Sequence, residues 1–310
     1  MGAASSNVRI SKITFTFFLF QVIILISCDS KENANKKNET TLSSGVLKVI
    51  ADDTFKSLLR TSVEIFEALT PAAKIELEYT PQEQAFADLL NRKTDVIIAG
   101  RPLSKAEEAI VKYKGLFPKV NKIASDGLIF IVSKNNTELQ ISEDKISRIL
   151  SGALKTKLIC DKSNSANIVY LKNKFNLPKE INNVFAAGSD SAVIEYIIKH
   201  KEAIGIIGMG LVSDYEDPKV QNRLSNIKLL SIEYKDSLGK IVIGNPTLEE
   251  LATKNYPFIR EIFIINLDGN TNLGTGFANF MVSERAQRIV LKSGILPFQL
   301  PRRDIIINND

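Results

Sequence analysis

The chain has 310 residues, and 40 Lys and Arg against 35 Asp and Glu give a formal net charge of +5. The basic residues are spread among acids and form no dense stripe with interleaved aromatic residues, which argues against a nucleic-acid-binding surface. One histidine and two cysteines form no cluster with metal-ligand spacing. We therefore expect no metal site, no other cofactor and no nucleic-acid partner.

The N-terminal segment has the pattern of an export signal. Arg9 and Lys12 precede an apolar run over residues 15–26, which suits a signal peptide and is shorter than the about 20 residues of a membrane-spanning helix. The run closes with Leu25-Ile26-Ser27-Cys28, which resembles the lipobox of bacterial lipoproteins. We expect a signal peptide over residues 1–27, lipidation of Cys28, and an exported, membrane-anchored protein that faces the periplasm or the cell exterior.

A polar tract separates this signal from the first apolar strand pattern. Residues 29–44 read DSKENANKKNETTLSS, which offers too little apolar surface to form a core. The tract predicts a flexible tether over residues 28–45. The second cysteine, Cys160, is left without an internal partner, so we expect a buried, inert thiol there.

The first folded segment alternates strand and helix patterns. Apolar residues at Leu58, Leu59, Val63 and Phe66 recur with helical spacing. A strand–helix–strand–helix–strand order predicts an α/β fold with a parallel sheet. The expected elements are strands at residues 47–51, 75–79 and 95–100 and helices at residues 55–69 and 85–90.

The alternation continues in the second half of the chain. Ser142 is a good N-cap, and Asp144 places an acid in the first turn of the helix that follows. The run AIGIIG from Ala203 is a buried strand pattern. The expected elements are strands at residues 127–133, 203–208, 227–234 and 259–267 and helices at residues 142–150, 165–175, 189–200 and 276–293.

Several short motifs occur in an order that is familiar from one family. They are ADDTFKSLL from Ala51, TDVIIAGRPLS from Thr94, SNSANIVYL from Ser163, KEAIGIIGMG from Lys201, YPFIREIFII from Tyr256 and TGFANFMVSERAQRIVLKSGILP from Thr275. Together they cover nearly the whole chain after the tether. The ordered set resembles the phosphate-binding protein of the ABC-type phosphate importer, in its lipoprotein branch.

The resemblance implies a two-lobed, periplasmic-binding-protein-like fold of type II. Each lobe would be a mostly parallel sheet flanked by helices, with the ligand in the cleft between the lobes. We place the two crossings near Asp126 and Leu224, so that lobe one comprises residues 46–125 and 225–310 and lobe two residues 126–224. The implied function is capture of inorganic phosphate or a similar oxyanion by a monomeric, non-enzymatic protein that delivers it to an ABC permease.

Two predicted helix starts carry the groups that an oxyanion needs. Free backbone N–H groups at a helix N-terminus point at one place and favour negative charge. At the first, the Thr54 hydroxyl and the Phe55 N–H are expected to reach the anion, and at the second Ser165 and Asn167 add a hydroxyl, an amide and N–H donors. The family uses matching residues at both places. The alternative for Thr54 and Ser165 is plain helix capping.

Two charged positions depart from the family pattern. Where the importer protein has an Asp after the third strand, this chain has Arg101, and where the family has an Arg before the second anion-binding helix, this chain has Asp161. We expect Arg101 to be the cationic partner of the ligand and Asp161 to accept a hydrogen bond from a protonated oxyanion. The alternative for Arg101 is a surface position or a salt bridge inside its lobe. In the preceding loop, Gln82 or Gln84 is the expected donor.

Three other functions stay open at this point. The exchanged charges suit a receptor of the same fold for a different ligand. A structural or adhesive lipoprotein that kept the fold and lost the ligand has the same pattern of elements. A surface phosphohydrolase would need metal ligands or an activated nucleophile, and the sequence offers neither.

Overall fold

The computed structural model describes residues 40–178, 181, 183–213 and 217–301. The expected signal peptide, Cys28 and most of the expected tether lie outside the described residues. Residues 41–44 already form a turn in which Thr41 N donates to Ser44 O at 3.0 Å, so ordered structure begins before residue 45. Among the described residues, no helix is both long and apolar enough to cross a membrane.

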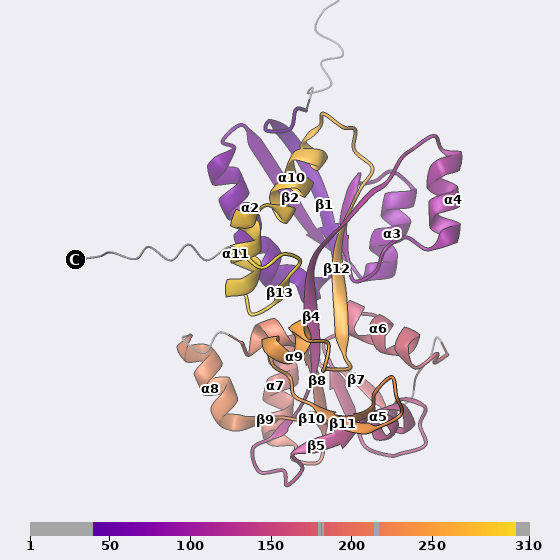
Figure 1. Cartoon of the computed structure of the whole chain (residues 1–310), viewed down its shortest axis with the longest axis vertical. Helices are drawn as coiled ribbons and strands as arrows, with labels where there is room; N and C mark the ends of the chain where they lie inside the picture. The colour runs from indigo at the N-terminus through magenta and orange to yellow at the C-terminus, as the bar shows by residue number, and fades with distance from the viewer. Residues whose placement is uncertain (1–39, 179–180, 182, 214–216, 302–310) are drawn as a thin grey trace, which may run out of the picture. The chain divides into compact units, whose positions relative to one another are not determined.

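The described chain alternates strands and helices throughout (Figure 1). The strands are β1 (Gly45–Ala51), β2 (Ala73–Tyr79), β3 (Val96–Ala99), β4 (Lys119–Ser133), β5 (Gln140–Ser142), β6 (Leu158–Cys160), β7 (Val184–Ala186), β8 (Ile204–Gly208), β9 (Ile227–Leu229), β10 (Ser231–Lys235), β11 (Ile241–Gly244), β12 (Ile259–Asn266) and β13 (Leu296–Pro297). The α-helices are α2 (Lys56–Leu69), α3 (Gln82–Leu90), α4 (Lys105–Tyr113), α5 (Glu143–Leu150), α6 (Ala166–Lys174), α7 (Asp190–Lys199), α8 (Pro218–Asn226), α9 (Leu248–Ala252), α10 (Leu273–Val282) and α11 (Glu284–Lys292). The 3-10 helices are η1 (Asp53–Phe55) and η2 (Met209–Leu211).

The first part of the main sheet has strand order β2-β1-β3-β12-β4. β1 pairs in parallel with β2 and β3, whereas β12 runs antiparallel to both β3 and β4. Successive residues of β1 point to opposite faces, so Val49 packs with α2, α10 and α11 while Ile50 packs with α3 and α4. Helices therefore cover both faces, and β3 and the last three residues of β1 are apolar and buried on both sides.

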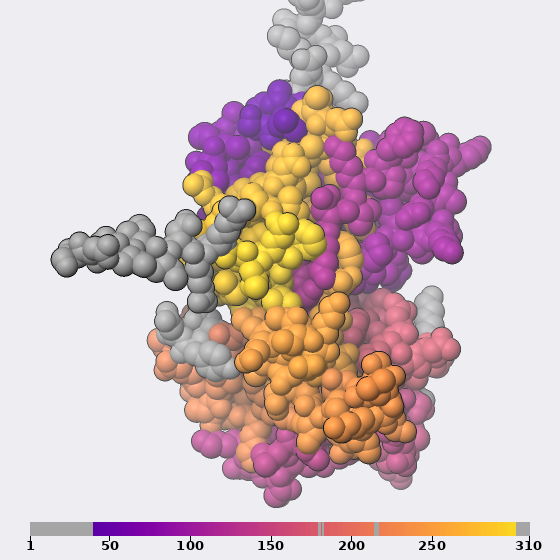
Figure 2. All heavy atoms as spheres, in the orientation of Figure 1, coloured from indigo at the N-terminus to yellow at the C-terminus, as the bar shows by residue number. Residues whose placement is uncertain are grey.

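The long strand β4 joins two halves of the fold. It pairs with β12 as far as Gly127 and with β8 from Leu128 onward. We call residues 40–126 and 259–301 lobe one and residues 127–258 lobe two. In Figure 2, the indigo residues after Thr40 and the yellow residues near the end of the described chain belong to the same lobe, so lobe one is discontinuous in sequence.

Lobe two has its own core around β4, β8, β6 and β7. β6 pairs in parallel with β7 and β8, and β8 runs antiparallel to β4. A second sheet of order β11-β10-β5 adds Ile141 and Ile232 to this core, and α5, α6 and α7 supply further apolar side chains. Cys160 on β6 is buried and is a free thiol, and burial raises its pKa to about 12.

The second crossing lies farther along the chain than we expected. The expectation near Leu224 is wrong because β9 pairs with β4 at residues 131–133 and Ile227, Leu230 and Ile232 belong to the lobe-two core. The chain returns to lobe one through β12, from Ile259. Sequence pattern alone could not decide this, since either lobe can bury such apolar strands.

Two predicted elements are divided in the structure. The expected helix over residues 276–293 is α10 followed by α11, because Ser283 adopts an extended conformation and caps α11 by accepting from Ala286 N. The expected strand over residues 227–234 is β9 followed by β10, which belong to different sheets. The helix is divided at polar Ser283, whereas the strand is divided at buried, apolar Leu230, where the chain passes from one sheet to the other.

Candidate ligand-binding cleft

Backbone donors from both lobes converge on the carboxylate of Asp52, which follows β1 and is 2% exposed. One carboxylate oxygen accepts from Thr54 N at 3.1 Å, and the other accepts from Gln82 N and Ala166 N, each at 3.1 Å. Gln82 and Ala166 are the first residues of α3 and α6, where backbone N–H groups have no partner within the helix. Helix starts from both lobes thus direct their donors at one anionic group.

Arg260 on β12 places a buried cation beside this point, with 1% of its surface exposed. It donates to Asn167 Oδ1 at 2.6 Å and to Asp126 Oδ2 at 2.9 Å, and it reaches Thr54 Oγ1 at 3.5 Å. Its guanidinium lies 4.8 Å from the centroid of the Phe55 ring. Within the described part of the chain, Arg260 Nε and Asn167 Nδ2 are buried donors without a hydrogen-bond partner.

Asp161 lies at the end of β6 and is 3% exposed. Its Oδ1 accepts from Ser165 Oγ at 2.7 Å, and its Oδ2 has no hydrogen-bond partner among the described residues. Burial raises the pKa of Asp161, and the hydrogen bond from Ser165 opposes that shift. Ser165 occupies the N-cap of α6, but its side chain makes no capping hydrogen bond. Its hydroxyl therefore orients Asp161 rather than capping the helix.

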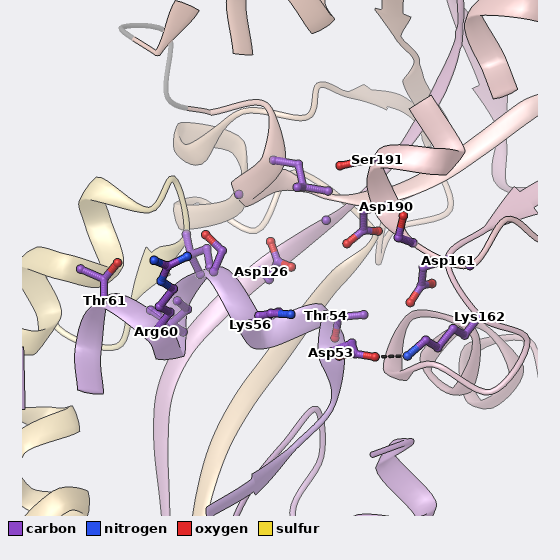
Figure 3. Close-up of a pocket in the computed structure, with 18 of the residues that line it drawn as sticks. Asp53, Thr54, Lys56, Arg60, Thr61, Asp126, Asp161, Lys162, Asp190 and Ser191 are labelled. Carbon is purple, nitrogen blue, oxygen red and sulfur yellow. Dashed lines mark hydrogen bonds and ion pairs between the residues drawn. The ribbon is translucent and has the colours of Figure 1, made fainter. Parts of the chain in front are cut away.

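A cavity of about 770 Å³ lies beside these groups and is lined from both lobes. Residues of η1 and α2 line one side. The other side is lined by Asp161, Lys162, residues 188–191, Gly208, Gly210 and Leu211. Asp53 and Lys162 form an ion pair across it, and Figure 3 shows Asp126, Asp161 and Asp190 around the same space. The cavity is thus lined by more carboxyl groups than cations on its lobe-two side.

Burial is the largest cause of the raised pKa of each of these carboxyl groups. Burial, and then the charge of Asp161, raise the pKa of Asp190 to about 7. Burial also raises the pKa of Asp126, which the charge of Arg260 opposes. Lys56 and Arg60 line the opposite wall from α2. The cleft can therefore offer both donors and acceptors to a small polar ligand near neutral pH.

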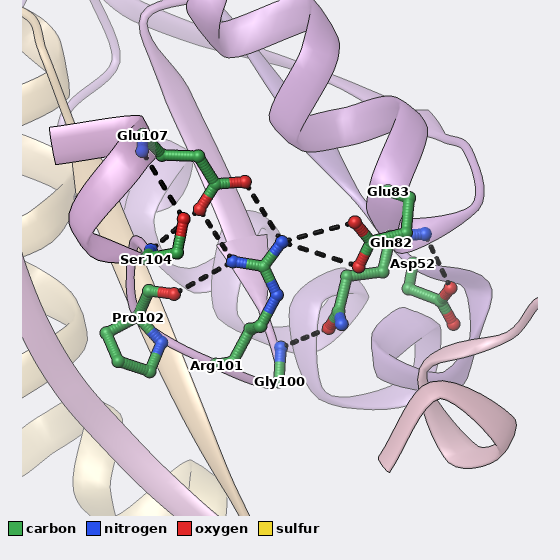
Figure 4. A network of polar contacts seen from close by, with 8 residues as sticks. All are labelled: Asp52, Gln82, Glu83, Gly100, Arg101, Pro102, Ser104 and Glu107. Atoms are coloured by element: carbon green, nitrogen blue, oxygen red, sulfur yellow. Dashed lines mark hydrogen bonds and ion pairs between the residues drawn. The ribbon is translucent and has the colours of Figure 1, made fainter. Parts of the chain in front are cut away.

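Arg101 makes its contacts inside lobe one and away from this cavity (Figure 4). It pairs with Glu107 through Nη1–Oε2 at 2.8 Å and Nη2–Oε1 at 3.0 Å, and with Glu83 at 3.2 Å. Its guanidinium lies 3.6 Å from the centroid of the Phe86 ring. These contacts correspond to the alternative of a lobe-internal salt bridge. Arg260 lies beside the converging donors, while Arg101 lines a smaller cavity together with Gln82 and Ala166.

The remaining predicted donors divide between the site and other contacts. Gln82 lies at the site through its N–H, while its Oε1 accepts from Gly100 N at 2.6 Å. Gln84 instead donates to Asp88 on the same helix. The Phe55 N–H donates to the main-chain oxygen of Asp52 at 3.0 Å, so it is not free for an anion.

The cleft residues that were not predicted from the sequence pattern include Asp52, Asp126, Asp190 and Arg260. Arg260 carried a usable signal, because it interrupts the apolar strand pattern YPFIREIFII at a position that faces the interior. Asp52 was visible only as part of a turn, although Asp is a strong N-cap residue. Asp126 and Asp190 follow no pattern that distinguishes them from exposed acids.

The two lobes, the long shared strand β4 and the polar cleft between them define a two-lobed α/β fold. A family model described as PBP superfamily domain matches residues 36–285, and the chain belongs to this superfamily. The phosphate-binding protein PstS of Staphylococcus haemolyticus is 24% identical over 212 residues, which are 63% of this chain and 62% of that protein. PstS of Staphylococcus aureus strain USA300 is 25% identical over 210 residues, 62% and 59% of the two chains. The chain spans somewhat less than two thirds of the length of these curated relatives.

Solved structures share the fold at low sequence identity. An ABC-type phosphate transport receptor from Vibrio cholerae matches 82% of this chain and 100% of its own, with a TM-score of 0.64 and 14% identity. PstS from Borrelia burgdorferi matches 83% of this chain and 100% of its own, with a TM-score of 0.55 and 21% identity. These likenesses establish the two-lobed architecture of this chain.

Proposed function

We propose that this chain is an extracytoplasmic solute-binding protein that captures inorganic phosphate or a similar oxyanion and delivers it to an ABC importer. The observation that carries the proposal is the convergence of the Thr54, Gln82 and Ala166 amides, from both lobes, on one anionic group. Helix starts arranged in this way are anion-binding sites. The ligand is held by hydrogen bonds and released unchanged, so the function requires no catalytic group.

The side chains around these amides complete a set that suits a protonated oxyanion. Asn167 Nδ2 and Arg260 Nε are buried donors without partners in the described chain, and Asp161 Oδ2 is a buried acceptor without one. An oxyanion that carries one proton needs donors for its bare oxygens and an acceptor for its hydroxyl. The role of Asp161 as that acceptor follows our expectation from sequence, whereas the cationic role passes from Arg101 to Arg260.

Calorimetric titration of phosphate and sulfate into the purified protein tests the proposal. In Asn167→Asp the side chain still accepts from Arg260, but the free donor becomes a second carboxylate oxygen. We expect phosphate affinity to fall at least tenfold, which is about 1.4 kcal/mol. Asn164→Asp is the matched control, since it makes the same change at an exposed position just before α6. Equal phosphate affinity in the parent protein and Asn167→Asp contradicts the proposal.

A second candidate is a ligand that carries its own hydrogen-bond donors, such as hydroxyl or ammonium groups. The carboxyl atoms Asp161 Oδ2 and Asp190 Oδ1 favour it, because both are buried without a partner in the described chain and both residues line the cavity of about 770 Å³. That volume exceeds what one inorganic oxyanion fills. Absence of any heat with phosphate and sulfate, together with binding of a hydroxylated phosphate ester, selects this candidate.

We also propose that the mature protein is a monomer tethered to the outer side of a membrane through lipidated Cys28. The apolar run over residues 15–26 and the closing Ser27-Cys28 support this proposal. Cys28→Ser is expected to abolish labelling by a fatty-acid analogue and to move the protein to the soluble fraction. Continued labelling and membrane retention of that variant contradict the anchor.

A further inference from the structure

The carboxylate of Asp52 occupies the place that a bound anion takes at converging helix starts. Its two oxygens receive three backbone N–H donors, each at 3.1 Å, from η1, α3 and α6. Asp52 is 2% exposed, so water does not solvate its carboxylate. In this arrangement the backbone donors of the cleft are already satisfied by a group of the chain itself.

One of these hydrogen bonds crosses between the lobes. Asp52 and Thr54 belong to lobe one, as does Gln82, whereas Ala166 is the first residue of α6 in lobe two. Asp53 adds a second crossing through its ion pair with Lys162, but both of those side chains are partly exposed and screened by solvent. Asp52 is therefore one of two buried polar contacts that hold α6 against lobe one, the other being the hydrogen bond from Arg260 to Asn167.

We propose that Asp52 is an internal competitor of the oxyanion, and that it sets the affinity of the cleft by holding the lobes together in the absence of ligand. This inference rests on the proposed oxyanion function. An incoming anion needs the same N–H groups, so it must displace the Asp52 carboxylate or bind only in the molecules where the carboxylate has moved away. If only a fraction of the molecules can bind the anion, the apparent dissociation constant equals the intrinsic dissociation constant divided by that fraction.

Two variants separate the charge of Asp52 from the donors that it uses. Asp52→Ser removes the carboxylate but keeps a hydroxyl that can cap η1, and the shorter side chain leaves Gln82 N and Ala166 N free. Ala166→Pro removes the N–H of the lobe-two donor, at a first helical position where proline is well tolerated. Ser165 before it is already extended, as a residue before proline prefers.

The two variants are expected to act in opposite directions on binding and in the same direction on shape. Asp52→Ser should bind phosphate at least tenfold more tightly than the parent, while Ala166→Pro should bind it more weakly because a donor is lost. Small-angle scattering without ligand should give a larger radius of gyration for both variants. Asp88→Ala is the control for loss of a buried acid, since Asp88 is 6% exposed and is bonded within lobe one.

The possible outcomes distinguish failure of this inference from failure of the proposed oxyanion-binding function. If the parent binds phosphate and Asp52→Ser binds it equally or more weakly, Asp52 is not a competitor and the inference is wrong. If neither protein binds phosphate or sulfate, the oxyanion function is wrong, and the scattering data alone then test whether Asp52 holds the lobes together. Equal radii of gyration for the parent and Asp52→Ser without ligand would show that it does not.

Discussion

Replacement of Arg260 by methionine gives the sharpest test of the polar contacts in the cleft. The methionine fills a similar apolar volume but removes the cation and the hydrogen bonds to Asn167 Oδ1 and Asp126 Oδ2. Asp126 is 4% exposed and its Oδ1 already has no partner among the described residues. After the substitution, its carboxylate would be buried without any counter-charge.

The loss of stability in Arg260→Met has an upper limit, because Asp126 can take up a proton instead of staying charged. Removing one partner of a buried ion pair costs about 3–5 kcal/mol. The alternative is to protonate Asp126, which from a reference pKa of about 3.9 costs about 4 kcal/mol at pH 7. We therefore expect Arg260→Met to lower the free energy of unfolding by about 3–4 kcal/mol at pH 7. Arg260→Met with Asp126→Asn should recover most of this loss.

The pH dependence of the loss follows from the pKa of Asp126. Burial raises this pKa in the folded state, and loss of the opposing Arg260 charge raises it further. A carboxyl with a raised folded pKa favours the native state at low pH, and this advantage disappears as pH rises through the folded pKa. The cost of Arg260→Met relative to the parent should therefore shrink as pH falls from 7 to 5, by at most about 1.4 kcal/mol for each pH unit.

Urea unfolding followed by circular dichroism at pH 5 and pH 7 measures these differences. The control is Arg60→Met, because the Arg60 side chain is 78% exposed and pairs with an exposed Glu64; it should change the unfolding free energy by no more than about 0.5 kcal/mol. A loss below about 1 kcal/mol for Arg260→Met at pH 7, or an equal loss at pH 5, would refute the reasoning about a buried, unpaired Asp126.

Three further predictions concern other groups. Asp190→Asn should gain urea stability relative to the parent as pH rises toward about 7 and level off above it, since the folded carboxyl keeps its proton up to that pH; a constant difference from pH 5 to 8 contradicts this. In a Cys28→Ser background, Cys160 should react with a thiol reagent at least a hundredfold more slowly in the native protein than in denaturant, since burial raises its pKa to about 12. Arg101→Ala should lower stability by about 1–3 kcal/mol through lost charged hydrogen bonds and leave phosphate affinity within about twofold; a larger loss of affinity would return Arg101 to the site.

The sequence predicted the fold well where a local apolar pattern is sufficient to determine which residues are buried. β1 and β3 are apolar in every buried position, and α2 carries Leu58, Leu59, Val63 and Phe66 on one face, so any globular arrangement must bury them. The point at which the chain returns to lobe one was harder to predict from the sequence. Ile227 and Ile232 are equally compatible with either core, and their place is fixed by pairing with β4 and β5, which are distant in sequence.

The site was predictable to the extent that it lies at helix starts. Thr54, Ser165 and Asn167 lie at these helix starts beside the cleft, because a strand that runs into a helix places such residues at the sheet edge. Their contact with a ligand stays a prediction. The charged partners were not predictable in this way. Arg101 and Arg260 both follow or interrupt apolar strands, and only the packing of Glu107 against the first and Asp126 against the second distinguishes their roles.

The buried polar atoms of the cleft together favour one kind of ligand. Asp126 Oδ1 and Asp161 Oδ2 are acceptors, and Asn167 Nδ2 and Arg260 Nε are donors, all without partners among the described residues. Each such group costs about 1–3 kcal/mol when it is left unsatisfied, and a chain selected for stability alone would replace them with apolar residues. A fully deprotonated anion satisfies the donors and is repelled by both carboxylates. A ligand that presents bare oxygens and at least one hydroxyl satisfies both sets, and we therefore expect a protonated oxyanion to bind more tightly than sulfate.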